Sequence, residues 1–145
     1  MKKKHLFLLQ IKPVLPAFLM LISAEISAQR LNLEPERTTN GNSTEVFPLA
    51  SDSLSSSFLI YIHTEVAPHY HAHHSEHVLV LEGEGTMLLN DSTIALKPQT
   101  AVFIPKGSVH SAQNTGSIPL KVISVQAPFF DGKDRIHIKK LEQGY

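Results

Sequence analysis

Three histidines and one glutamate stand at spacings that would let them meet on one metal ion. His69 and His71 flank a single residue, Glu76 follows after four more, and His110 comes later in the chain. Imidazole and carboxylate ligands together suit Fe(II), Mn(II), Ni(II), Zn(II) or Cu(II) and disfavour calcium, which prefers oxygen ligands. Four protein ligands leave a six-coordinate ion two open positions, a feature of catalytic sites. We therefore predict one divalent transition metal ion as the cofactor.

The elements around these residues must be strands. Residues two apart in a strand point to the same face, so His69 and His71 would face inward together. A short turn would bring Glu76 back on the neighbouring strand. The segment 105–107 contains Pro and Gly, which favour a tight turn. We expect this turn to deliver His110 from a third strand.

The neighbouring histidines leave an alternative ligand set open. His73 has the same parity as His71, and His71, His73 and Glu76 would form a competing triad. We favour His69 and His71 as ligands and expect His73 behind them or at the rim of the site. His74 is expected on the exposed surface, and His77 in a contact on the outer face of its sheet.

The rest of the chain has the pattern of short apolar runs and turn residues that is typical of an all-β protein. Short apolar runs alternate with Gly, Pro, Asn, Asp and Ser, and no run has helical spacing over three turns. Asn90 and Asp91 favour a two-residue hairpin turn. Many short strands at such spacings predict a barrel or sandwich. The candidate strands are Glu45–Leu49, Ser57–His63, His69–His73, Glu76–Glu82, Gly85–Leu89, Ser92–Leu96, Ala101–Ile104, His110–Asn114, Leu120–Gln126 and Arg135–Lys139.

Two segments resemble the conserved motifs of the cupin superfamily. Pro68–Gly83 is similar to the first motif, His-x-His followed by Glu and Gly, and Pro105–Asn114 is similar to the second, Pro-x-Gly-x-x-His-x-x-x-Asn. The resemblance implies a double-stranded β-helix (jelly-roll) barrel and assigns the four metal ligands named above. Two departures concern turns that lead into the motifs, where His63 and Gln99 replace expected glycines.

The first 28 residues have the composition of an export signal. A basic start at 2–4 precedes the apolar run Val14–Ile22 and the small residues Ser23–Ala28. The apolar run is less than half of the roughly 20 residues that span a bilayer, which argues against an anchor. We predict cleavage after Ala28, or after Ala24 as a second candidate, and a periplasmic or secreted protein with no membrane attachment. The expected organisation is a signal peptide (1–28), an N-terminal surface segment (29–43) and one barrel domain (44–145).

Composition limits the partners of the mature chain. The whole sequence has 13 basic and 13 acidic residues; the leader removes four lysines and one glutamate, leaving 9 against 12. This mild acidity, without a basic stripe, argues against nucleic acid. There is no cysteine, so stability must come from the core, a metal or self-association. The run Val78–Leu81 is apolar on both faces, which favours a homodimer.

Other residues are candidates for a small-molecule pocket or its surroundings: Tyr61, Met87, Phe103 and Gln126, together with His73. Gln126 could orient a ligand oxygen, and Phe129–Phe130 with the following turn could form a packing flap. No Ser-His-Asp group, carboxylate pair or phosphate-binding Gly loop is evident, so no catalytic residue is assigned beyond the metal site.

Three function classes remain. The first is a metal-dependent enzyme acting on a small oxygenated substrate, with dioxygenase chemistry ahead of decarboxylation or isomerisation. The second is a non-catalytic cupin that binds an organic acid, phenolic or sugar derivative. The third is a metal-stabilised structural or interaction domain. Fold alone does not choose among them.

Overall fold

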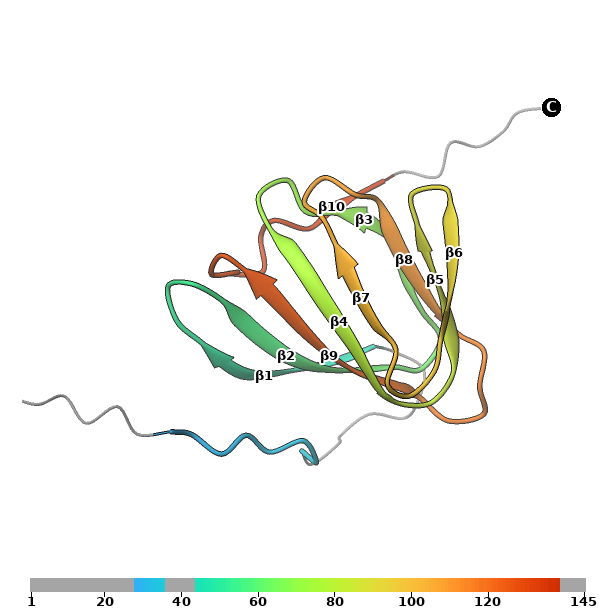
Figure 1. Ribbon diagram of the computed structural model, residues 1–145, viewed down its shortest axis with the longest axis horizontal. Coiled ribbons are helices and arrows are strands. Elements are labelled where there is room, and N and C mark those ends of the chain that lie inside the picture. Colours follow the sequence, from blue (N-terminus) through green and yellow to red (C-terminus); the bar gives the residue numbers. More distant parts are fainter. Residues whose placement is uncertain (1–27, 36–43, 139–145) are drawn as a thin grey trace, which may run out of the picture.

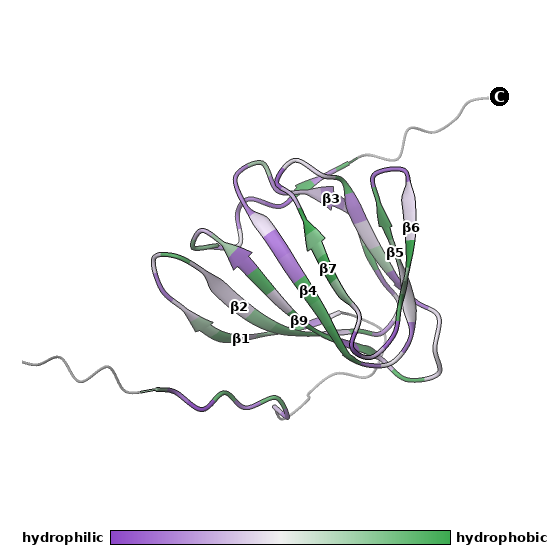
Figure 2. Ribbon diagram, in the orientation of Figure 1, coloured by the Kyte–Doolittle hydropathy of each residue, from purple (hydrophilic) through white to green (hydrophobic). Residues whose placement is uncertain are grey.

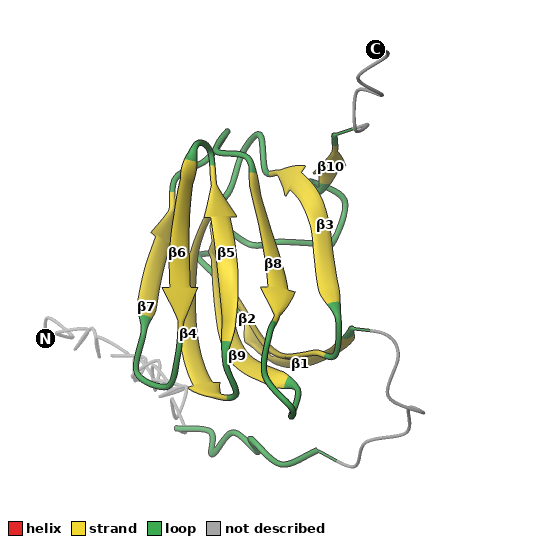
Figure 3. Ribbon diagram, turned by 90° about the vertical axis from the view of Figure 1, so that its right-hand side faces the viewer, coloured by secondary structure: helices red, strands yellow, loops and turns green. Residues whose placement is uncertain are grey.

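Ten β-strands form the described part of the chain, in a computed structural model that describes residues 28–35 and 44–138. These ranges contain no helix (Figure 3). The predicted leader lies outside the described residues apart from Ala28, as do residues 36–43 and 139–145. The strands are β1 (Glu45–Ser51), β2 (Ser56–Ile62), β3 (Glu65–Tyr70), β4 (Ser75–Glu82), β5 (Gly85–Leu89), β6 (Ser92–Leu96), β7 (Ala101–Ile104), β8 (His110–Asn114), β9 (Leu120–Ala127) and β10 (Ile136–His137).

The strands form two antiparallel sheets that face each other (Figure 1). One sheet has the order β1-β2-β9-β4-β7 and the other β10-β3-β8-β5-β6. From β3 onward the chain passes repeatedly from one sheet to the other, so the strands of the two sheets are interleaved along the sequence. This winding confirms the expected double-stranded β-helix.

Alternation along the strands builds the core between the sheets. In β4, Glu76, Val78 and Val80 point inward and are buried, whereas His77 and Leu79 face outward and are exposed. Figure 2 shows hydrophobic positions on strands of both sheets. Each buried aliphatic side chain contributes about 1.5–3 kcal/mol. The buried cluster consists of Ile62, Val78, Val80, Met87, Leu96, Val102, Ile104, Ala112, Leu120 and Val122.

The described N-terminal residues lie outside the barrel. They are mostly exposed. Glu34 forms an ion pair with Lys121 of β9, which also pairs with Glu82 at 2.8 Å. Lys121 is 3% exposed, so two carboxylates compensate a nearly buried charge.

The third strand differs from its predicted bounds, and this changes how Glu76 reaches the site. Strand β3 ends at Tyr70, so His71 lies just beyond it, and β3 and β4 belong to different sheets. The backbone amides of Ala72 and His73 donate to the carboxylate of Asp134 instead of to a strand. The chain therefore crosses between sheets here, and Glu76 approaches from the opposite sheet and not from a neighbouring strand.

Two tight turns use positive φ angles at residues other than glycine. The predicted hairpin turn is present, with Leu89 paired to Ser92 and Asn90 at φ 50°. In the turn from Lys97 to Thr100, the amide of Thr100 donates to the carbonyl of Lys97 at 2.9 Å, and Gln99 has φ 73°. This is the third position of a type II turn, which favours glycine. Gln99 thus adopts the backbone of the glycine that the cupin pattern leads one to expect.

His63 is the other position at which the cupin pattern has a glycine, and its backbone differs from that of Gln99. His63 has no positive φ. Its Nε2 lies 2.7 Å from the buried carboxylate of Glu45. The side chain at this position therefore makes a hydrogen bond that glycine could not.

We expect Gln99→Gly to raise the free energy of unfolding. Removing the left-handed strain gains about 1–2 kcal/mol, and the greater freedom of glycine in the unfolded chain costs about 0.5–1 kcal/mol. The net gain should be about 0.5–1 kcal/mol, measured by urea unfolding. The control is Gln113→Gly in β8, an exposed position without a positive φ, which should destabilise the protein. Equal losses in both variants would contradict the strain argument.

Candidate metal centre

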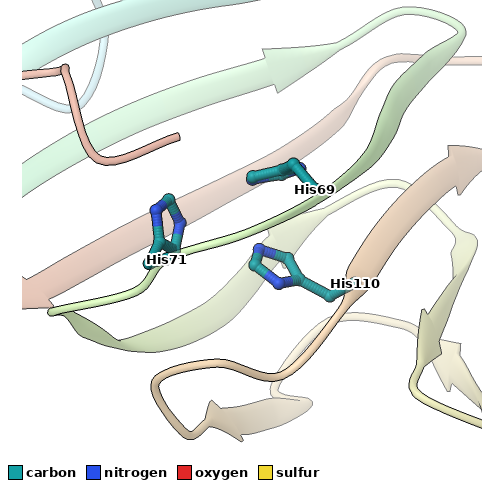
Figure 4. A group of neighbouring side chains, drawn as sticks. All are labelled: His69, His71 and His110. Atoms are coloured by element: carbon teal, nitrogen blue, oxygen red, sulfur yellow. The ribbon is translucent and has the colours of Figure 1, made fainter. Parts of the chain in front are cut away.

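Three buried histidines converge between the two sheets (Figure 4). His69 at the end of β3 is the register partner of His110 at the start of β8, and their ring centroids are 4.2 Å apart. His71 joins them from the loop after β3. Each residue offers one nitrogen, and these nitrogens all lie within 4.8 Å of one another. The structure thus brings the three predicted imidazoles together.

Each of the three rings is fixed by a hydrogen bond to the backbone. A carbonyl oxygen only accepts, so the bonded Nδ1 must carry a proton, and Nε2 is the nitrogen left to bind a metal ion. This tautomer is the one that a metal ligand coordinating through Nε2 requires. The Nδ1 atoms donate to the carbonyl oxygens of Ala67 for His69 (2.9 Å), of Ser108 for His110 (3.1 Å) and of Asp134 for His71.

Glu76, the fourth predicted ligand, comes from the facing sheet and lies beside two of the three histidines, outside the group whose ligand atoms all lie within 4.8 Å of one another. Its Oε2 lies 3.3 Å from Nε2 of His71 and 3.5 Å from Nε2 of His110. Its Oε1 accepts a hydrogen bond from the hydroxyl of Ser124. Burial acts to raise the pKa of Glu76, but the hydrogen bonds from His110, His71 and Ser124 outweigh it and hold the pKa well below its usual range. The carboxylate is therefore ionised.

The imidazoles differ in their affinity for a proton. Burial lowers the pKa of His69 to about 3, so this ring is neutral. Burial opposes protonation of His71 as well, but the hydrogen bond to Glu76 outweighs it and raises the pKa of His71 above its ordinary value. A metal ion would take the place of the proton between His71 and Glu76. Three imidazoles and an ionised carboxylate fit a divalent transition metal ion.

The cluster forms part of the wall of an apolar cavity of about 120 Å³. Met87 and Gln126, both predicted for the pocket, line it. Gln126 is the register partner of Glu76 across β4 and β9. The remaining lining residues are mainly aliphatic or aromatic, and Arg135 joins them from the C-terminal segment.

Three residues predicted for the pocket or its surroundings lie elsewhere. In β2, Ile60 and Ile62 line the cavity, so Tyr61 between them faces the other side, where its ring lies 6.0 Å from that of Phe47. Phe103 is 52% exposed on the outer face of β7, against the ring of His77.

His73 is the third of these residues, and its side chain is exposed. It is not part of the histidine cluster, which contains His69 instead. The competing triad of His71, His73 and Glu76 is therefore not assembled in the structure.

The C-terminal segment contributes contacts that the sequence did not reveal. The Asp134 carboxylate accepts hydrogen bonds from the amides of Ala72 (2.9 Å) and His73 (2.8 Å) and lies 2.6 Å from Nδ1 of His74. His74 was expected to be exposed but is 8% exposed, because its Nε2 also binds the carbonyl of Phe129. The turn before Asp134 was visible in the sequence, but no signal tied it to the ligand loop.

Phe130 packs beside the cluster as the expected flap would. Its ring contacts those of His71 and His74 edge to face, with centroids 5.3 and 5.1 Å apart. Its amide donates to the hydroxyl of Ser56 at 3.0 Å. The segment from Phe129 to Asp134 is thus fastened over the loop that carries His71.

Known proteins share both the sequence and the fold of this chain. An uncharacterised protein of Aquifex aeolicus is 36% identical over 107 residues, which are 74% of this chain and 88% of that protein. A mannose-1-phosphate guanylyltransferase of Klebsiella pneumoniae is 38% identical over 66 residues, which are 46% of this chain but only 14% of that enzyme. A solved structure from Klebsiella pneumoniae subsp. pneumoniae, a conserved protein with a double-stranded β-helix domain, covers 78% of this chain and 100% of its own at 25% identity and a TM-score of 0.65.

A family model gives the assignment. The model of the mannose-6-phosphate isomerase C-terminal domain, a cupin family, matches residues 59–143. This match extends over more than half of the sequence and includes every residue of the histidine cluster. The chain therefore belongs to the mannose-6-phosphate isomerase C-terminal family of the cupin superfamily.

Proposed function

We propose that this chain is an exported metal-binding cupin that acts as a metal-dependent enzyme on a small oxygenated organic substrate. The observation that carries the proposal is the convergence of three histidines, each with Nδ1 satisfied by a carbonyl, on the wall of an apolar cavity. A structural metal site is closed by its ligands, whereas a site beside a cavity leaves room for a substrate. Dioxygenase chemistry is the first reaction class to test, followed by decarboxylation and isomerisation.

The residues of the chain have separate tasks in this proposal. His69, His71 and His110 would hold the ion, and Glu76 would add a negative charge to it. The ion, when bound, would polarise an oxygen of the substrate. The aliphatic walls exclude water, which strengthens electrostatic interactions inside the cavity.

A non-catalytic binding protein is the second candidate, and one observation favours it. Apart from the four predicted ligands, the titratable group lining the described cavity is Arg135, whose guanidinium stays protonated and is a poor general base. Proton transfer would therefore have to use the metal centre itself. Ligand-induced stabilisation without turnover would support this candidate.

Loss of a predicted ligand should abolish metal binding. We expect His110→Ala and Glu76→Ala to lower metal affinity by at least about 100-fold, measured as metal content of untagged protein after dialysis. His73→Ala is the matched control, because it removes an exposed histidine from the same loop and should keep the metal. Loss of metal in His73→Ala but not in His110→Ala would refute the ligand assignment.

The same variants test whether the metal centre is catalytic. Oxygen uptake is measured with Fe(II)-loaded protein and a panel of catechols, flavonols and diketones. Consumption by the wild type and by His73→Ala, but not by His110→Ala, supports the dioxygenase class. Full activity in metal-free His110→Ala would show that the metal has no catalytic role.

We propose that the protein is exported from the cytoplasm to the periplasm or the medium. The basic start, the apolar run Val14–Ile22 and the small residues before Gln29 support a cleaved leader. The described part of the chain contains no helix with the length and hydropathy needed to span a bilayer. Expression with the leader in a bacterial host should yield protein outside the cytoplasm that begins at Gln29, as read by N-terminal sequencing. Intact Met1 on all of the protein would contradict this.

A homodimer through the outer face of β4 and β7 is the proposed assembly. Leu79 and Phe103 are 40% and 52% exposed on this face, and β7 is an edge strand. Phe103→Glu should therefore convert a dimer into a monomer, as measured by light scattering. Leu88→Glu is the control, since Leu88 is 42% exposed on β5 of the other sheet. A monomeric wild type, or the same result for both variants, would contradict this interface.

A further inference from the structure

Two polar groups on the cavity wall have no partner of their own. Gln126 is 6% exposed, and its Oε1 is buried with no hydrogen-bond donor among the described residues. Arg135 lines the same cavity, and its guanidinium forms no hydrogen bond or ion pair within the described part of the chain. A buried polar atom is normally satisfied, so the Gln126 oxygen is available to a ligand. Arg135 is exposed, and its guanidinium is available because no described residue pairs with it.

Gln126 and Arg135 lie at different parts of the cavity wall. Gln126 lies beside Glu76 in the β4–β9 ladder. Arg135 lines the cavity and also an outer groove, and Phe58 and Phe130 line both as well. Arg135 thus lies where the cavity and the groove adjoin, and Gln126 lies next to the cluster.

The fold holds Arg135 in place through the preceding residue. Asp134 is bound to the amides of Ala72 and His73 through its carboxylate, and its carbonyl accepts from His71. Arg135 follows directly and is succeeded by β10, which pairs with β3. The backbone of Arg135 is therefore fixed on both sides, which lowers the cost of ordering this residue around a ligand.

With a divalent ion bound, the net positive charge of the cavity would favour an anionic ligand. A divalent ion with the Glu76 carboxylate leaves one positive charge, and Arg135 adds another. No further acidic residue lines the described cavity, whose other walls are mostly apolar. Positive charge beside apolar walls attracts a negatively charged ligand.

A carboxylate fits this site better than a phosphate does. One guanidinium can bind a carboxylate through two parallel hydrogen bonds. Phosphate sites use several backbone amides or a helix N-terminus, and no helix occurs in the described residues. Gln126 offers an acceptor for a hydroxyl group and, through its amide NH₂, donors for an oxygen.

We propose that the cavity takes a small organic monocarboxylate that also carries a hydroxyl or carbonyl oxygen. Arg135 binds the carboxylate, and Gln126 binds the second oxygen beside the metal centre. This inference rests on the proposed function, since it deepens the description of the same site.

The test compares an acid with its neutral analogue on metal-loaded full chain. Metal content is determined first, and binding of lactate, lactamide and inorganic phosphate is then measured by titration calorimetry. Lactate should bind at least about tenfold more tightly than lactamide. Metal-loaded protein that binds lactate no better than lactamide would overturn the inference and leave the proposed metal centre standing. Protein that holds no metal would refute the proposed function as well.

Variants identify the group that binds the acid. Arg135→Gln should lose at least about tenfold in lactate affinity while keeping its metal content and its weak affinity for lactamide, and Arg135→Lys should recover part of the loss. Lys133→Gln is the matched control, because it removes the same charge from the same segment at an exposed side chain paired with Asp131. Unchanged lactate binding in Arg135→Gln would overturn the inference, as would equal losses in Lys133→Gln. Tighter, Arg135-dependent binding of phosphate than of lactate would overturn the choice of a carboxylate.

Discussion

The hydrogen bonds from the three imidazole Nδ1 atoms to backbone carbonyls are the constraint on which the site depends. Two of them are local, since Ala67 and Ser108 each stand two residues before the histidine that they orient. The pairing of β3 with β8 therefore sets His69 and His110 together. His71 lies beyond β3 and takes its partner from Asp134, 63 residues later. The third ring thus depends on the return of the C-terminal segment.

The Asp134 carboxylate holds the C-terminal segment in this position. Burial acts to raise the pKa of Asp134, but the hydrogen bonds from His74, His73 and Ala72 outweigh it and hold the pKa well below its usual range. The carboxylate therefore stays ionised. It accepts hydrogen bonds from the backbone amides of Ala72 and His73, which lie beyond the end of β3 and do not pair with a strand. Because Arg135 is the next residue, the contact that orients His71 also fixes the backbone next to Arg135, which lines the cavity. The orientation of the third imidazole and the position of Arg135 therefore depend on one loop.

The sequence revealed the strands and the ligand spacing, because both follow from local alternation and turn residues. It did not reveal which sheet each strand joins, since period-2 alternation is the same in either sheet. The faces of β2 and β7 were ambiguous for a related reason: residues 58–62 and 101–104 are apolar at every position. Tyr61 and Phe103 were accordingly assigned to the pocket although they face outward. Gln126 was predicted as an uncharged amide near a strand end that could orient a ligand oxygen, and the structure places it on the cavity wall.

A metal ion in this site would join the two sheets. His69 and His110 belong to one sheet and Glu76 to the other, and the chain has no cysteine that could form another covalent or metal-thiolate link. A ligand that binds only the folded state adds RT ln(1 + [L]/Kd) to its stability. Without an ion, the same place holds a buried carboxylate whose desolvation is costly, and the hydrogen bonds from His71, His110 and Ser124 offset that cost. A bound ion would therefore add its binding free energy to a cluster that already satisfies its carboxylate.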